Sequence, residues 1–383
     1  MSDVVFVTRL LTHYRVPFHA LVRDGLAAQG VRYRLLHSNP RAAERALAGP
    51  ASLHWAQRVP AVSWGPFAWQ QIIGATRGAD LVIIGQENGL LANYALMARR
   101  RLGGAPLALF GHGHNWQSPN PNGLAERFKR AWICEADWWF AYTERCAAAV
   151  RDAGYPAGRI TVFNNAVDTE AIRARVVAHD PVALSALRSG RYAGSCNIAV
   201  QVGTLHARRR PDFLIAAADL VRAQVPDFQL VVIGDGPERD TLRAASATRP
   251  WLHLEGALYG TAKSQHMALA AVQLLPGLVG LGILDGFAHG LPALATRYPY
   301  HSPEIDYLVD GGNGVVTPND PRAYAEALVA LLRDPGARAR MSEQALRTAG
   351  HHTISAMAER FVAGTVSALA ANRQQRTRTV TVG

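Results

Sequence analysis

The feature that most constrains the fold is a repeated alternation of short apolar runs with longer helical patterns. Val4–Thr8 reads as a buried strand before a helical pattern over Pro17–Ala28, and the same order restarts with Ile198–Val202 before Pro211–Val225. Strands that alternate with helices form parallel sheets whose two faces are covered. We therefore predict an α/β chain with two Rossmann-like, doubly wound parallel-sheet domains that face a cleft.

The alternation also suggests where the domains divide. It lapses between Asp180 and Ser195, where Gly190, Gly194 and several arginines interrupt it. A chain of 383 residues is long enough for two or three domains. We predict an N-terminal domain over residues 1–180, a linker over 181–195 and a C-terminal domain over 196–352. A last helix over 353–372 is expected to cross back to the first domain, followed by a disordered basic tail over 373–383.

The charge balance indicates the kind of partner. The formal net charge is +11 and the sequence pI is near 10. A basic chain favours nucleotides, nucleic acid or an acidic membrane face, although a generally basic solvated surface accounts for most of these charges equally well. We find no nucleic-acid-binding module in the sequence.

Three cysteines, few and widely spaced, argue against a disulfide framework and for a reducing, cytoplasmic compartment. The N-terminus runs directly into the first strand pattern, so we expect no signal peptide. The uncharged stretch Met267–Leu284 just reaches the length of a membrane span, but Pro276 and three glycines would break a lipid-exposed helix.

One loop with three closely spaced glycines follows an apolar run in the second half of the chain. Gly277, Gly280 and Gly282 come after Pro276, and Asp285 lies in the first turn of the helical pattern that follows. Free N–H groups at the start of a helix attract anions, and a carboxylate there can accept from a ligand hydroxyl. The alternative is that these glycines only permit tight packing of the loop.

Three other loops follow strands of the same half. Arg208, Arg209 and Arg210 precede a helix and suit a diphosphate, because guanidinium is always charged and binds phosphate through two hydrogen bonds. A solvated basic turn is the alternative. Gly234-Asp235-Gly236 is either a plain tight turn or a close backbone approach to a ligand, and Ala257-Leu258 could present backbone groups to a planar base.

The order of these motifs resembles that of GT-B glycosyltransferases of family GT4. Gly203-Thr204-Leu205 through Arg209 is followed by Val232–Pro237, by the loop that ends in Gly290-Leu291-Pro292, by Ser302-Pro303-Glu304 and by Asp310–Gly314. Val162–Asp168 is similar to the segment between the two domains of that family, and Phe110–Gly113 to its histidine after a strand.

The resemblance implies a retaining sugar transfer from a nucleotide donor, UDP- or GDP-linked, held by the C-terminal domain, while the N-terminal domain holds the acceptor. It implies no cofactor and no metal, and the chain has no Asp-x-Asp sequence. Arg209 matches the family's diphosphate-binding Lys, with Arg208 or Arg210 as the second charge because Thr204 replaces the usual Arg. Arginines there would stabilise the negative charge that develops on the leaving diphosphate.

The resemblance gives three candidates for catalysis, His112, Arg209 and Asp285, with His112 near the anomeric carbon. The donor-binding candidates are Gly203, Thr204, Arg208, Arg210, Gly234, Asp235, Gly236, Ala257, Leu258, Gly280, Leu281, Gly282, Ile283 and Glu304.

One position departs from the family pattern. The family has two glutamates eight residues apart, and here they fall on Gly277 and Asp285. Asp285 can still accept from ribose hydroxyls, whereas Gly277 has no side chain to bind the sugar. We expect a Gly277→Glu variant to alter donor preference more than stability.

Acceptor-binding candidates lie in loops after strands of the first half: His13, Tyr14, Arg15, Glu87 and His114, with Arg9 beside them. The basic and aromatic stretch Arg127–Trp132, with Trp138-Trp139 and Arg99–Arg101, predicts peripheral contact with the anionic inner face of a membrane, although a strand position favours core packing for at least one of the two adjacent tryptophans.

Two alternatives stay open at this point: a GT-B sugar-nucleotide epimerase, and a catalytically degenerate GT-B subunit that only binds a nucleotide. A dehydrogenase is disfavoured, because no G-x-G-x-x-G follows either first strand.

Overall fold

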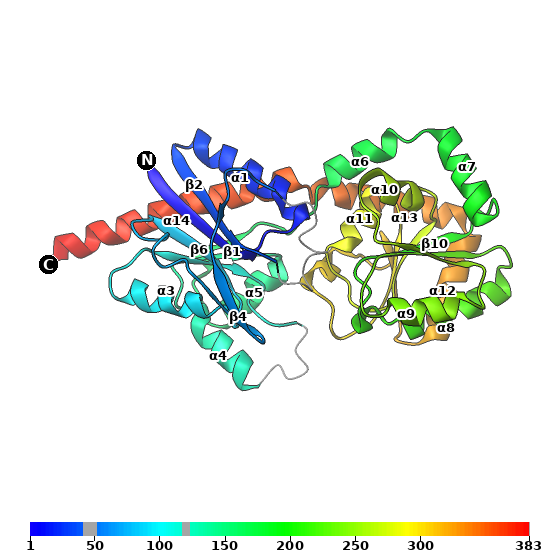
Figure 1. Cartoon of the computed structure of the whole chain (residues 1–383), viewed down its shortest axis with the longest axis horizontal. Coiled ribbons are helices and arrows are strands. Elements are labelled where there is room, and N and C mark those ends of the chain that lie inside the picture. Colours follow the sequence, from blue (N-terminus) through cyan, green and yellow to red (C-terminus); the bar gives the residue numbers. More distant parts are fainter. Residues whose placement is uncertain (41–51, 117–122, 383) are drawn as a thin grey trace. The chain divides into compact units, whose positions relative to one another are not determined.

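The computed structural model describes residues 1–40, 52–116 and 123–382. The chain divides into two compact units (Figure 1). The first unit comprises Met1–Asn165 and Ile354–Gly383, and the second comprises Ala166–Thr353. Every helix in the described ranges is too short or too polar to cross a membrane.

The first unit contains a parallel sheet with the strand order β3-β2-β1-β6-β7-β8-β9. Its strands are β1 (Ser2–Leu10), β2 (Val31–Ser38), β3 (Gln57–Arg58), β6 (Leu81–Gly85), β7 (Leu107–Gly111), β8 (Trp138–Ala141) and β9 (Ile160–Val162). Its helices are α1 (Val16–Ala28), α3 (Leu91–Arg101), α4 (Leu124–Ile133), α5 (Glu144–Asp152) and α14 (Ile354–Val382), with the 3-10 turns η1 (His13–Arg15) and η3 (Ala157–Arg159). A separate antiparallel hairpin joins β4 (Ala61–Trp64) to β5 (Phe67–Gln70).

The last helix completes the core of the first unit. Helix α14 packs against α1, β8 and β9 (Figure 1). The fully buried ring of Phe361 lies 4.3 Å from Phe140 and 5.2 Å from Phe18, measured between ring centroids. The disordered tail predicted from residue 373 is wrong for the described residues, since α14 continues to Val382.

The second unit contains a second parallel sheet, with the strand order β12-β11-β10-β13-β14-β15. Its strands are β10 (Ile198–Val202), β11 (Gln229–Ile233), β12 (Leu252–Gly256), β13 (Val272–Leu275), β14 (Ala293–Thr296) and β15 (Gly314–Thr317). Its helices are α6 (Thr169–Val177), α7 (Pro181–Tyr192), α8 (Pro211–Gln224), α9 (Arg239–Ser246), α10 (Gly260–Ala268), α11 (Gly282–Ala288), α12 (Pro321–Arg333) and α13 (Pro335–His351), with the 3-10 turns η4 (Ala207–Arg209) and η5 (Pro303–Tyr307).

The segment predicted as a linker, residues 181–195, is instead largely helix α7. Pro181 occupies its first turn, and the Asp180 side chain caps it by accepting from the Val182 N–H at 2.9 Å. Proline at the first position and Asp at the N-cap are both favourable helix starts. Tyr192, at the end of α7, is fully buried in the core of the second unit, which explains why this helix is held in place.

Both sheets reverse their winding direction once. In the first unit β2 and β3 extend one side of β1, and β6 begins the other side. In the second unit β11 and β12 extend one side of β10, and β13 begins the other. The loops that leave the two strands at such a point diverge and open a crevice at the carboxyl edge of the sheet, where doubly wound proteins bind ligands. In this chain the loops at that point are residues 11–15 and 86–88 in the first unit, which line a cavity, and residues 203–210 and 276–282 in the second.

Candidate functional site

In the second unit, the loops after β10 and β13 meet backbone to backbone. The Leu278 N–H donates to the Arg208 carbonyl at 2.9 Å. A Cβ added at Gly277 would lie 2.0 Å from that same oxygen. Gly277 is therefore required for this close approach. The expectation that Gly277→Glu would alter donor preference more than stability is wrong, because the added side chain would collide with the Arg208 main chain.

The loops after β10 and β11 meet in the same manner. A Cβ at Gly234 would lie 1.9 Å from the Gly203 carbonyl oxygen, and one at Gly236 would lie 2.3 Å from that of Leu205. Asp235 is exposed, and its carboxylate accepts from the Gly236 N–H at 2.9 Å. These glycines assemble the carboxyl edge of the sheet, and Asp235 stabilises a turn within it.

Arg209 lies between the loops after β10 and β13. Its guanidinium rests on Gly203, where a Cβ would meet Nη2 at 2.8 Å, and its Nη1 donates to the Leu278 carbonyl at 2.8 Å. Its buried Nε has no partner among the described residues, and no described carboxylate lies within ion-pair distance. Loss of water lowers the pKa of Arg209 to about 10, so the side chain is still charged at neutral pH.

The two neighbouring arginines differ from Arg209. Arg210 donates to the Pro276 carbonyl at 2.9 Å and to Asn319 Oδ1 at 2.5 Å, and its guanidinium lies 4.0 Å from the Phe213 ring centroid. These contacts hold it to its own unit. Arg208 is exposed, as is Thr204, whereas Arg210 is half-buried, so Arg208 is the more accessible of the two arginines.

Asp285, in the first turn of α11, is held by a lysine that the sequence reasoning missed. Lys263 Nζ donates to its two carboxylate oxygens at 2.8 and 2.9 Å. His289 donates from Nδ1 to the Asp285 carbonyl at 2.7 Å. The sequence does carry one signal for Lys263, since it and Lys129 are the only lysines in the chain.

The other donor-binding candidates spread around this edge of the second sheet. Gly280, Leu281, Gly282 and Ile283 form the start of α11, Ala257 is exposed after β12, and Leu258 packs on a core cluster. Glu304 is buried in η5. A second missed residue is His301, whose Nδ1 accepts from the Val279 N–H at 3.1 Å and fixes the loop after β13.

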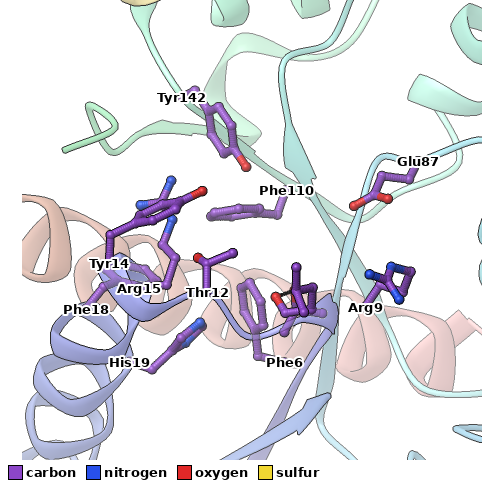
Figure 2. A pocket seen from close by; sticks show the side chains of 12 residues that line it. Phe6, Arg9, Thr12, Tyr14, Arg15, Phe18, His19, Glu87, Phe110 and Tyr142 are labelled. Carbon is purple, nitrogen blue, oxygen red and sulfur yellow. Dashed lines mark hydrogen bonds between the residues drawn. The ribbon is translucent and has the colours of Figure 1, made fainter. Parts of the chain in front are cut away.

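The first unit holds a cavity of about 300 Å³ at the crevice between β1 and β6 (Figure 2). Three of the predicted acceptor residues, Tyr14, Arg15 and Glu87, line it, together with Arg9. Six further lining residues were not predicted from the sequence as acceptor contacts. They are Phe6, Thr12, Phe18, His19, Phe110 and Tyr142. Three of them could have been predicted from their position after or near the end of a strand: Thr12 follows β1, and Phe110 and Tyr142 lie at the ends of β7 and β8.

The histidines predicted for this unit do not line that cavity. His112 packs edge-on against the Tyr142 ring, 4.2 Å between centroids, and lies 3.8 Å from the buried Cys146 Sγ. His114 lies 3.9 Å from Glu126, and His13 packs against Tyr14. Within the described ranges, no three His, Cys, Asp or Glu side chains are grouped to hold a metal ion.

Comparison with known proteins gives one family for each half of the chain. Residues 196–334 match the model of glycosyl transferases group 1, and residues 20–171 match that of glycosyltransferase family 4. An α-D-kanosaminyltransferase of Streptomyces kanamyceticus is 28% identical over 67% of this chain and 69% of its own length. A GDP-mannose-dependent phosphatidylinositol monomannoside mannosyltransferase of Mycolicibacterium smegmatis is 32% identical, over 46% of this chain and 47% of its own.

Solved structures show the same fold at lower sequence identity. Anabaena HepE, in complex with UDP and glucose, is 16% identical and superposes with a TM-score of 0.70 over 96% of this chain and 100% of its own. Sucrose-phosphate synthase of Thermosynechococcus elongatus is 15% identical, with a TM-score of 0.71 over 97% and 100%. The two parallel-sheet units are thus those of a GT-B fold.

Proposed function

Because the chain is a glycosyltransferase with the GT-B fold, and its halves match glycosyltransferase family 4 and glycosyl transferases group 1, we propose that it transfers a sugar, with retention of configuration, from a UDP- or GDP-sugar. The second unit binds this donor, and the first binds a glycan, lipid-linked or small-molecule acceptor. The names of two similar proteins support a nucleotide-linked donor, one through bound UDP and one through GDP-mannose.

The proposed donor site rests on one observation, the charge of Arg209. A half-buried guanidinium without a carboxylate partner costs free energy unless an anion joins it. The Arg209 side chain contacts the loops after β10 and β13, where the winding of the sheet reverses, and Arg208 adds a second charge to the same loop. A nucleoside diphosphate supplies the missing anion.

The proposed chemistry needs little from the protein beyond charge. The bond between the anomeric carbon and the diphosphate oxygen breaks, and the acceptor oxygen bonds to that carbon on the same face. The acceptor's proton passes to the departing phosphate oxygen, so no protein base and no metal is required. Arg209 and Arg208 stabilise the negative charge as it develops. His112 stays a prediction for the surroundings of the anomeric carbon.

The test is a thermal-shift screen of nucleotide sugars, followed by measurement of slow nucleotide release from each donor that binds. Ligands that bind the folded state raise its melting temperature. We expect Arg209→Gln to abolish the shift and the release. Arg243→Gln, which removes an exposed charge of the same unit, serves as the matched control. A donor site at Arg209 is excluded if no nucleotide shifts the wild-type melting temperature, and binding without release from any donor supports the non-catalytic alternative.

We further propose a cytoplasmic location with peripheral contact to an anionic membrane face. The three cysteines are unpaired. Exposed apolar side chains in the first unit include Trp64 and Phe67 of the β4–β5 hairpin and Leu124 of α4, a helix that also carries the exposed Arg127 and Arg130. Aromatic and basic residues together favour a membrane interface.

Part of the sequence argument for this contact is corrected. Trp138 and Trp139 are both buried in β8, 6% and 0% exposed, and cannot reach a membrane. The side chains of Phe128 and Lys129 lie outside the described residues. Sedimentation with anionic liposomes at low salt tests the proposal, with Trp64→Ser/Phe67→Ser as the variant and neutral liposomes as the control. Equal binding to both vesicle types would contradict it.

A further inference from the structure

The cavity of the first unit is lined on one side by a cation that has only neutral partners. Arg15 Nη2 donates to Asn165 Oδ1, and Nη1 donates to Met357 Sδ at 3.4 Å. An amide oxygen and a thioether accept hydrogen bonds without neutralising the charge. No carboxylate in the described part of the chain lies within ion-pair distance of Arg15.

Aromatic rings surround that guanidinium. Its Cζ lies 5.3 Å from the ring centroid of Tyr14 and 5.9 Å from those of Phe18 and Tyr142. Cation–π contacts hold the group in place, but they leave its positive charge. The nearby His19 reports this field: burial first, and then the charge of Arg15, lowers its pKa to about 3, so His19 is neutral.

One buried polar atom at the cavity lacks a hydrogen-bond partner in the described part of the chain. The Thr12 Oγ1 is buried and has no hydrogen-bond partner among the described residues. Buried hydroxyls are rarely left without one, unless a ligand or water completes them. Figure 2 shows Thr12 beside Tyr14 and Arg15, whereas Arg9 and the carboxylate of Glu87 lie together on the other side. One side of the cavity is therefore positive with a spare hydroxyl, and the other contains both signs of charge.

We propose that the acceptor presents an anionic group, a carboxylate or a phosphate, to Arg15 and a polar oxygen to Thr12, while its sugar or carrier packs against the aromatic rings. This inference rests on the proposed function in assigning the cavity to the acceptor. A carboxylate would come from a uronic acid, and a phosphate from a sugar phosphate or a lipid carrier. The Arg15 guanidinium suits either a carboxylate or a phosphate, because its planar group pairs with each through two hydrogen bonds.

Calorimetric titration of the full chain tests this, with three probes: glucuronate, glucose 1-phosphate and methyl α-glucoside. Saturating UDP or GDP, whichever raises the melting temperature, is present, so that Arg209 does not bind the phosphate probe. We expect at least one anionic probe to bind about tenfold or more tightly than the neutral glucoside, the scale of a charged hydrogen bond. Which anion binds distinguishes the two sources. Equal affinities for all three probes, or no binding, would overturn the proposal.

Variants locate the site. Arg15→Gln is expected to remove the preference for the anion, and Arg15→Lys to retain part of it. Arg77→Gln, an exposed arginine of the same unit, is the control for charge and should leave it intact. If Arg15→Gln does not fold, Thr12→Val tests the same site. Unchanged affinity for the anionic probe in both Thr12→Val and Arg15→Lys would contradict the inference. Arg209→Gln, titrated without nucleotide, should still bind whichever anionic probe the wild type binds, so a failed donor site and a failed acceptor site give different results.

Discussion

Gly277 shows how one residue in the second unit constrains the loop after β13. Its Cα faces the Arg208 carbonyl, where an added Cβ would lie 2.0 Å from the oxygen. Gly280, three residues on, has only the Ser302 side chain near its Cβ position, at 3.8 Å. The two glycines share one loop, yet only the first is required by sterics.

We therefore expect Gly277→Ala to destabilise the second unit by about 1–3 kcal/mol, the usual cost of overpacking, and to weaken nucleotide binding as Arg208 shifts. Gly280→Ala is the matched control and should change stability little. Urea denaturation followed by tryptophan fluorescence measures the difference. Equal effects of the two substitutions would show that the contact with Arg208 does not constrain the loop.

His19 gives the first unit a predictable response to acid. It is buried, its Nδ1 lies 2.9 Å from the Tyr33 hydroxyl, and burial together with Arg15 lowers its pKa to about 3. In the unfolded chain His19 takes up a proton near its ordinary pKa of 6.5, whereas in the folded chain it does so only near 3. The unfolded state thus gains protons first, and stability is lost as the pH falls from 6.5 toward 3.

We expect the His19→Gln variant to be less sensitive to acid than the wild type between pH 6.5 and 4, even where it is less stable at pH 7. The readout is the difference in denaturation midpoint between the two pH values, not the midpoint itself, because Gln also changes the contact with Tyr33. His37, whose pKa burial also lowers, leaves a residual slope in both proteins. Identical slopes for the two proteins would refute the assignment.

Among the elements, helix α7 depends on its cap. The Asp180 carboxylate accepts from the Val182 N–H, and α7 then places Tyr192 in the core of the second unit. Asp180→Ala is expected to cost about 1 kcal/mol, as N-cap removal does elsewhere. Asp180→Asn keeps an acceptor oxygen and should retain most of that stability. Chemical denaturation compares the two variants, and an Ala variant as stable as Asn would argue against the cap.

The sequence was sufficient for the elements whose pattern is local. Val4–Thr8 and Ile198–Val202 are apolar because strands of a covered parallel sheet are buried on both faces, and both lie within strands of the structure. The linker prediction was wrong at α7 because Gly190 and several arginines interrupt its apolar pattern. Two helix-start residues, Asp180 and Pro181, did indicate a helix there. Glycine in a helix interior costs about 1 kcal/mol, and the burial of Tyr192 offsets that cost.

The candidate sites were predictable only where position along a strand decides them. Tyr14, Arg15 and Glu87 follow β1 and β6 and meet in one cavity for that reason. His112 also follows a strand, but it turns toward Tyr142 and Cys146, which no local pattern could indicate. The pairing of Lys263 with Asp285 joins two helices 22 residues apart, and such contacts depend on packing rather than on spacing.

At the scale of the whole molecule, the first unit is discontinuous in sequence. Phe361, which follows all of the second unit in the chain, fills the core of the first among Phe6, Phe18 and Phe140. Phe361→Ala is expected to cost the first unit about 3–5 kcal/mol. Glu359→Ala, exposed on the same helix, should change stability by less than about 0.5 kcal/mol.

Calorimetry in the presence of a bound nucleotide separates the two units in this experiment. The ligand should raise the transition of the second unit, whereas Phe361→Ala should lower that of the first. A single transition lowered as a whole by Phe361→Ala would mean that the units do not unfold independently, and no change at all would contradict the packing described for α14.

The return of α14 to the first unit also has a consequence for how the protein is made. The ribosome releases Met1–Asn165 first, yet that segment lacks Phe361 until residues beyond Ile354 have emerged. Domains fold during synthesis once their own residues are available. The second unit, whose residues end at Thr353, is therefore complete before the first, and α14 cannot cover its apolar surface on the first unit until the second unit has been translated.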